Sequence, residues 1–262
     1  MSELRPLALD GPAGRLAGWT LGELDGAVPV LFCHPVNTEG RAWAPIAAQL
    51  DGRPALLPDL RGHGASDPGG PYSIPLWVDD LVAVLDHLGV EAVHVVGGSL
   101  GGAMAVELAA RMPERVRSIA SFGGTLCVRD DATAFSDLLD EHGVEGTFRL
   151  LIPELSVAPG SSEETVEAAV ALANRNDAPV VAAILAAALD TDLRHRAGDV
   201  RCPALVACGE HDRTCPPEHS REMAGLLGTE AVVMPGIGHL TMLEDPAATT
   251  RLLAGHLAAA DA

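Results

Sequence analysis

The stretch that decides the fold is VHVVGGSLGG, residues 93–102. Its first half is a β-branched, apolar run typical of a buried strand, and the residues that follow, 103–110, are good helix formers. A serine between glycines therefore stands where a strand turns sharply into a helix. Gly97 and Gly101 lack Cβ atoms, so they can accept the close packing and unusual backbone angles of such a turn. The pattern predicts that Ser99 is a nucleophile and that the N–H of Leu100 points toward an oxyanion formed on it.

A serine becomes a nucleophile at neutral pH only beside a base, and the base needs an acid to orient it. Candidates for both come later in the chain. Asp212 lies in the loop GEHD after the strand-like run 203–208, and His239 lies in the loop PGIGHL after the strand-like run 230–234. Both loops follow the carboxyl ends of predicted strands, where open parallel sheets place their sites. We therefore predict a catalytic set of Ser99, Asp212 and His239, with Glu210 as the alternative acid.

Several separate motifs resemble the α/β-hydrolase family, and together they cover nearly the whole chain. They are HPVN at 34–37, PDLRGHGAS at 58–66, GEHD at 209–212, GH at 238–239 and EDP at 244–246. The order of serine, acid and histidine along the chain is also that of the family. Within the family, the chain is most similar to 3-oxoadipate enol-lactonases and related small esterases. The resemblance implies an α/β-hydrolase fold, in which a mostly parallel, doubly wound sheet carries an inserted helical lid.

One position departs from the family pattern. The HPVN segment resembles the family's oxyanion loop, but Pro35 stands where glycine is usual. Proline has no N–H to donate, so the resemblance assigns the second donor of the oxyanion hole to Val36, beside Leu100. The same resemblance implies structural roles for two further histidines. His34 is expected to order this loop, and His63 to brace the sheet edge rather than act as the base.

Turn residues and apolar periodicity divide the chain into a core and an insertion. Residues 4–9 and 15–21 predict an opening hairpin, after which short apolar strands alternate with amphipathic helices. This alternation predicts an α/β protein with a mostly parallel sheet that is covered on both faces. Between 125 and 196 the alternation stops and alanine-rich helical segments begin. We predict a lid, or cap, at 125–196, inserted into a hydrolase core formed by 1–124 and 197–262.

The predicted lid helices span 132–142, 146–151, 162–174 and 179–190, and Ser161 and Ser162 are candidate caps for the third. Helices inserted before the acid strand would cover Ser99 and exclude water. Their apolar side chains are candidates for an acyl pocket or for the lid's own core: Phe135, Leu138, Phe148, Leu151, Ile152 and Ile184. The substrate of the enol-lactonases is anionic and needs a cation, for which the lid offers Arg129, Arg149 and Arg175.

Composition narrows the classes of partner. The formal net charge of −19 over 262 residues disfavours nucleic acid and anionic membrane surfaces. The five cysteines are scattered without a framework, which argues for reduced thiols, and no spacing of histidines or cysteines indicates a metal. We expect no cofactor.

The N-terminus lacks the pattern of a signal peptide, and the longest apolar stretch, 178–189, is shorter than the roughly 20 residues of a membrane span. These features predict a soluble, cytoplasmic protein and leave its oligomeric state open.

The leading hypothesis is a serine hydrolase that cleaves a small ester or lactone, its small-molecule acyl substrate, through an acyl-enzyme intermediate. The same three residues would also suit a carbon–carbon bond hydrolase, a thioesterase, or a hydrolase or cyclase of natural-product biosynthesis. A ligand-binding module without turnover is the alternative from another class. A serine at position 99 disfavours the dehalogenases and epoxide hydrolases of this fold, which use an aspartate nucleophile.

Overall fold

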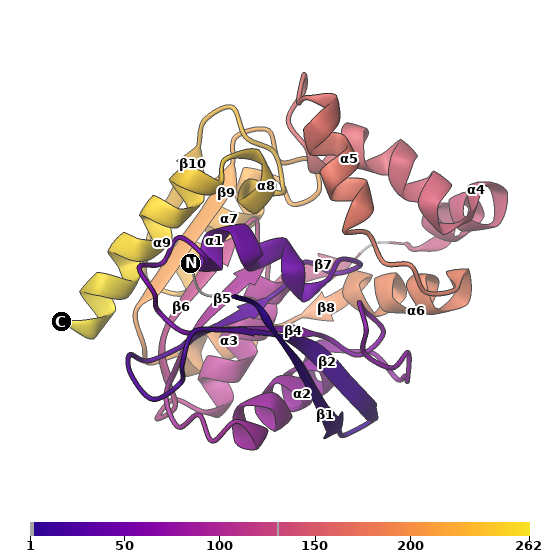
Figure 1. The fold of residues 1–262 in the computed structure, drawn as a ribbon. Helices are drawn as coiled ribbons and strands as arrows, with labels where there is room; N and C mark the ends of the chain where they lie inside the picture. The colour runs from indigo at the N-terminus through magenta and orange to yellow at the C-terminus, as the bar shows by residue number, and fades with distance from the viewer. Residues whose placement is uncertain (1–2, 130) are drawn as a thin grey trace.

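The computed structural model describes residues 3–129 and 131–262. For residue 129 it describes the backbone but not the side chain. Its centre is an eight-stranded sheet in the order β1-β2-β4-β3-β5-β6-β9-β10 (Figure 1). β2 pairs antiparallel with β1 and with β4, and the other neighbouring strands are parallel. The predicted hairpin and mostly parallel sheet are both present. The strands are β1 (Arg5–Gly11), β2 (Gly14–Leu21), β3 (Val30–Cys33), β4 (Ala55–Asp59), β5 (Val93–Gly98), β6 (Val116–Phe122), β9 (Ala204–Gly209) and β10 (Ala231–Met234).

The sheet has a hydrophobic core on each face, because successive side chains of a strand point to opposite sides. Val95 of β5 packs on one face with side chains of α2, α3 and α7. Val96, the next residue, packs on the other face with side chains of α1 and α9. This arrangement confirms the doubly wound α/β fold. These helices are α1 (Ala44–Ala47), α2 (Ile74–His87), α3 (Leu100–Arg111), α7 (Pro217–Leu226) and α9 (Pro246–Asp261). Three short elements, η1 (Gly40–Trp43), η3 (Arg194–Asp199) and α8 (Thr241–Glu244), complete the core.

Most of the segment between β6 and β9 forms a group of helices beside the sheet, on the right of Figure 1. A small antiparallel ladder of β7 (Cys127–Arg129) and β8 (Asp190–Asp192) brings its two ends together. Between them lie α4 (Thr133–Leu151), a π-helical turn η2 (Ile152–Ser156), α5 (Glu163–Ala171) and α6 (Ala178–Leu189).

Helices α4 and α5 correspond to helices predicted from the sequence. The segments 132–142 and 146–151, predicted as two helices, correspond to the two helical parts of α4, which meet at a kink at Gly143 with φ of 66°. Glycine tolerates this positive φ, so the helical geometry is interrupted at Gly143 and the chain changes direction there. Ser162 caps α5, because its hydroxyl accepts a hydrogen bond from the N–H of Thr165 at 3.1 Å. Across residues 3–129 and 131–262, every helix is too short or too polar to span a lipid bilayer.

Candidate active site

Ser99 occupies the turn between β5 and α3, with φ of 53° and ψ of −126°. Few L-residues adopt these angles, and the close packing around the turn explains why this one is held there. A Cβ placed on Gly97 would lie 2.1 Å from the carbonyl carbon of Gly101. A Cβ on Gly101 would lie 2.3 Å from the carbonyl oxygen of Cys33 in β3. The two glycines therefore let α3 pack directly against the sheet, and this packing positions Ser99 at the carboxyl end of β5.

Asp212 and His239 meet at the same edge of the sheet. Asp212 follows β9 and His239 follows β10, and Nδ1–H of His239 donates to Oδ2 of Asp212 at 2.8 Å. The other carboxylate oxygen accepts the N–H of Cys215 at 2.7 Å. Both side chains are almost fully buried, with residue exposures of 3% for Asp212 and 4% for His239. This hydrogen bond fixes the tautomer of His239 and leaves Nε2 as the nitrogen that can accept a proton.

Ser99 and His239 line one pocket, which Val36 also lines. Within the described residues no hydrogen bond joins Ser99 to His239; the Ser99 side chain lies beside the thiol of Cys215. Burial raises the pKa of that thiol to about 12, so Cys215 stays protonated at neutral pH. Sequence reasoning did not find the contact between Cys215 and Ser99, because it joins two loops that are more than 100 residues apart.

The alternative acid, Glu210, is directed elsewhere. Its carboxylate accepts the N–H of Gly236 at 3.0 Å, and its side chain is exposed. Of the two acids considered from the sequence, Asp212 is therefore the one in contact with His239. Gly123, at the end of β6, leaves room for this contact, because a Cβ there would lie 3.0 Å from the Asp212 carboxylate and 3.1 Å from Nδ1 of His239.

The backbone near Ser99 offers donors for a negative charge. Leu100 is the first residue of α3, so its N–H has no acceptor within the helix, and the helix dipole adds partial positive charge there. Across the pocket, Pro35 has no N–H, and the N–H of Asn37 donates to Nε2 of His63 at 3.0 Å. Val36, between them, lines the pocket. The role of Leu100 and Val36 as the two donors stays a prediction.

His34 and His63 are held in neutral, structural roles. Nδ1–H of His34 donates to the carbonyl of Pro35 at 2.8 Å, and its Nε2 accepts the N–H of Leu60 at 3.1 Å. Nδ1–H of His63 donates to the carbonyl of Arg61 at 3.0 Å. Burial lowers the pKa of both rings below the ordinary value for histidine. Because both nitrogens of each ring bond to the backbone, neither histidine has a nitrogen available to serve as the base for Ser99.

The PDLRGHGAS loop, residues 58–66, makes further buried hydrogen bonds and a buried ion pair at this end of the sheet. The Asp59 carboxylate accepts the N–H groups of Gly40 at 2.8 Å and Ala65 at 2.9 Å. Arg61 forms a two-pronged ion pair with Asp80 of α2, with both distances at 2.6 Å. These bonds give the loop a structural role next to the pocket.

The pocket has a volume of about 390 Å³ and is walled mainly by apolar side chains of the segment 125–196. Of the six apolar side chains considered from the sequence, five line it: Phe135, Leu138, Phe148, Leu151 and Ile152. Ile184 does not, and this expectation is corrected: Ile184 is fully buried and packs in the core that contains Trp77. Its neighbour Leu185 lines the pocket instead. Helix α6 is apolar on all sides, so periodicity could not indicate which of its residues faces the pocket.

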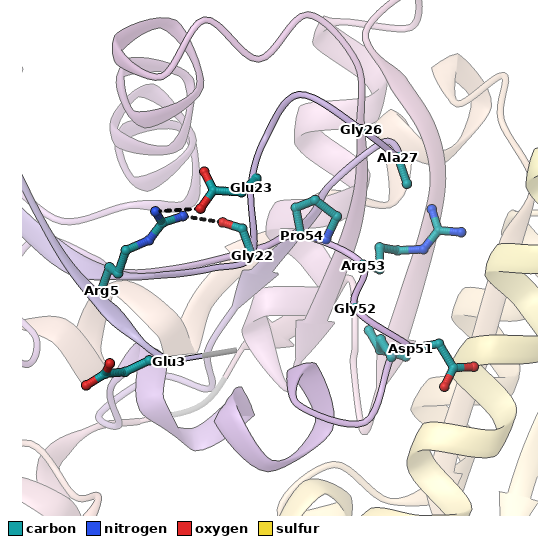
Figure 2. Close-up of a pocket in the computed structure, with 11 residues that line it drawn as sticks. Glu3, Arg5, Gly22, Glu23, Gly26, Ala27, Asp51, Gly52, Arg53 and Pro54 are labelled. Carbon is teal, nitrogen blue, oxygen red and sulfur yellow. Dashed lines mark hydrogen bonds and ion pairs between the residues drawn. The ribbon is translucent and has the colours of Figure 1, made fainter. Parts of the chain in front are cut away.

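A second hollow lies at the opposite, amino-terminal end of β3 and β4 (Figure 2). It has a volume of about 650 Å³ and contains Arg5 and Arg53. Figure 2 shows Arg5 bonded to Glu23 and to the carbonyl of Gly22. Arg53 pairs with Asp261. Because both guanidinium groups already have partners and the lining includes neither serine nor histidine, the Ser99 pocket is the better candidate for chemistry.

Comparison with known proteins agrees with this geometry. A model of the alpha/beta hydrolase family matches residues 30–252. The chain belongs to the α/β-hydrolase family. Over 242 residues, it is 31% identical to the pimeloyl-[acyl-carrier protein] methyl ester esterase of Chromobacterium violaceum, covering 87% of this chain and 93% of that protein. Over 258 residues, it is 28% identical to the 2-hydroxymuconate semialdehyde hydrolase of Pseudomonas putida, covering 89% of this chain and 88% of that protein.

Among solved structures, the enol-lactonase from Burkholderia xenovorans matches this α/β-hydrolase with a TM-score of 0.84 at 24% identity, over 98% of this chain and 97% of that one. This likeness supports the fold. The predicted family, the predicted fold and the prediction of a hydrolytic enzyme are thereby confirmed. These three proteins are named as a methyl ester esterase, a semialdehyde hydrolase and an enol-lactonase, so the family alone does not select the reaction.

Proposed function

We propose that this α/β-hydrolase is a serine hydrolase that cleaves a small ester or lactone through an acyl-enzyme intermediate. The observation that carries the proposal is the 2.8 Å hydrogen bond from His239 to Asp212, which orients an imidazole in the pocket that holds Ser99. Ser99, His239 and Asp212 act as nucleophile, base and acid, and the N–H groups of Leu100 and Val36 form the oxyanion hole. The segment 125–196 acts as the lid that covers this site.

The reaction begins when the Ser99 hydroxyl turns toward Nε2 of His239. Hydrogen bonds of catalytic groups often tighten only in the substrate complex. Oγ attacks the carbonyl carbon as its proton passes to Nε2, and the two backbone N–H groups stabilise the oxyanion. The bond to the leaving oxygen then breaks, and Nε2 gives that oxygen the proton.

Deacylation repeats these transfers with water. His239 takes a proton from water, whose oxygen attacks the acyl carbon, and the bond to Ser99 Oγ breaks as the proton returns to Ser99. The products are an acid and an alcohol, or one hydroxy acid from a lactone. Asp212 keeps its charge throughout and stabilises the imidazolium form of His239.

The test combines labelling with a substrate panel. We expect a fluorophosphonate probe to label the wild-type protein and not Ser99→Ala, and short p-nitrophenyl esters and lactones to be hydrolysed only by the wild type. Thioesters and a 2-hydroxy-6-oxo dienoate complete the panel. Faster turnover of either would favour a thioesterase or a carbon–carbon bond hydrolase. Absence of both labelling and turnover would favour a binding module.

A further inference from the structure

The pocket around Ser99 is suited to one chemical class of acyl group. This inference rests on the proposed function and makes it more specific. We propose that the acyl group is an uncharged, apolar chain of medium length, and that the ring of Phe148 forms the end wall of the space that receives it. Two independent features carry the proposal: where the described cations of the lid lie, and the position of Phe148, which lines two neighbouring cavities.

Among the described side chains, the positive charges lie away from the pocket. All 17 basic residues of the chain other than histidine are arginines, and none of the described residues that line the Ser99 pocket is an arginine. Arg149 bonds to the carboxylates of Glu145 and Glu167, and Arg175 donates to the carbonyl of Ala171. Both line a different cavity. The third lid arginine considered from the sequence, Arg129, has a side chain outside the described part of the structure.

An acyl group with a terminal carboxylate would have to lose its water shell against the apolar walls that Phe135, Leu138 and Leu151 provide. A carboxylate buried without a paired cation is strongly disfavoured. An alkyl chain gains from the same walls, because its apolar surface leaves water. The pocket therefore discriminates between two acyl groups of equal length by the charge at the far end.

The length of the acyl chain that fits is set by the volume of the Ser99 pocket and by the position of Phe148. A water-sized unit occupies about 30 Å³, so the pocket of about 390 Å³ holds on the order of a dozen non-hydrogen atoms. Such a space suits an acyl chain of about six to eight carbons with a small leaving group. Phe148 packs against Phe135 with ring centroids 6.1 Å apart. Its side chain and Ala173 also line the neighbouring cavity of about 450 Å³, so the Phe148 ring stands between the two spaces.

The charge test compares p-nitrophenyl hexanoate with mono-p-nitrophenyl adipate, which has the same acyl length and a terminal carboxylate. We expect kcat/KM to be about 100-fold higher for the hexanoate. Equal values would overturn the charge part of the proposal, and a loss of adipate turnover in Arg149→Ala would do so by revealing a cation in reach. If Ser99→Ala abolishes hydrolysis of both esters, the proposed function stands whichever ester is preferred.

The length test uses p-nitrophenyl esters of 2 to 12 carbons with wild type, Phe148→Ala and Leu150→Ala. Leu150 is on the same helix, is 48% exposed and does not line the pocket, so it is the matched control. We expect Phe148→Ala to move the optimum to longer chains and to raise kcat/KM for the dodecanoate about tenfold, with the control profile unchanged. Phe148→Leu, a milder change, is expected to shift the optimum in the same direction. A folded Phe148 variant with the wild-type profile would overturn the length part of the proposal.

Discussion

Ser99, the proposed nucleophile, has an unfavourable backbone conformation. At φ of 53° and ψ of −126°, a non-glycine residue costs on the order of 1–3 kcal/mol of stability. The surrounding structure holds it there because β5 and α3 are locked together through Gly97 and Gly101. The strain places Oγ in the pocket, so stability and function are opposed at this residue.

This opposition predicts that Ser99→Gly is more stable than Ser99→Ala although both are inactive. Glycine relieves the strain, and its greater freedom in the unfolded chain offsets roughly 0.5–1 kcal/mol of the gain. We expect the free energy of unfolding of Ser99→Gly to exceed that of Ser99→Ala by about 1 kcal/mol, measured by urea denaturation. A less stable glycine variant would contradict the assignment of strain to this position.

Asp212 is expected to act on the rate through His239 alone. In Asp212→Asn, the amide cannot hold the same tautomer of His239, so we expect kcat for a p-nitrophenyl ester to fall by about 10⁴ with little change in fold, by analogy with a serine protease triad. Circular dichroism and steady-state kinetics measure the two effects. Glu210→Gln is the control, because Glu210 bonds to Gly236 rather than to His239. Full activity of Asp212→Asn would place the catalytic acid elsewhere.

At the scale of elements, hydrogen bonds hold the proposed lid against both sides of the pocket. Asn174 donates to the carbonyl of Gly62 at 2.8 Å and to the side chain of Asn37 at 3.2 Å. On the other side, the carbonyl of Ser156 accepts the N–H of His239 at 3.0 Å, and the Glu244 carboxylate bonds to the N–H of Ala158 at 2.7 Å. The helices that would line the acyl pocket are thus attached to the same loops that carry Val36 and His239.

The attachment of α2 to the PDLRGHGAS loop gives a prediction about stability. Asp80 pairs with Arg61, and their side chains are 2% and 4% exposed, so Asp80→Ala leaves a buried guanidinium without its partner. We expect a loss of about 3–5 kcal/mol in the free energy of unfolding. The adjacent Asp79 pairs with Arg111 on the surface, with 45% and 29% exposure, and Asp79→Ala should cost less than about 1 kcal/mol. Equal losses in urea denaturation would show that burial does not distinguish the two pairs.

At the scale of the whole molecule, three fully buried histidines make stability depend on pH. Burial lowers the pKa of His34, His63 and His94 below 6.5, their value in the unfolded chain. The unfolded state then binds more protons than the folded state as pH falls below 6.5. The stabilising contribution is complete above that pH and is lost progressively as pH falls toward the folded pKa values.

We therefore expect the urea midpoint to fall between pH 7 and pH 5.5, above the range in which most carboxylates titrate. Each histidine contributes up to about 1.4 kcal/mol per pH unit. His63→Gln removes one such group and should give a shallower dependence than the wild type. A midpoint that stays constant over this range would contradict the buried, neutral state of these rings.

The strand, turn and helix around Ser99 could be predicted from sequence because glycine placement and apolar periodicity are local properties of the chain. The edge of the sheet that carries Asp212 and His239 could also be predicted, since the ends of parallel strands meet whatever their separation along the chain. Tertiary structure alone decided that Leu185 rather than Ile184 faces the pocket, because α6 is apolar on every side. It also decided that Cys215 lies beside Ser99 and that Arg149 and Arg175 lie outside the pocket. Such contacts depend on how distant segments pack against each other, and no local pattern in the chain records that packing.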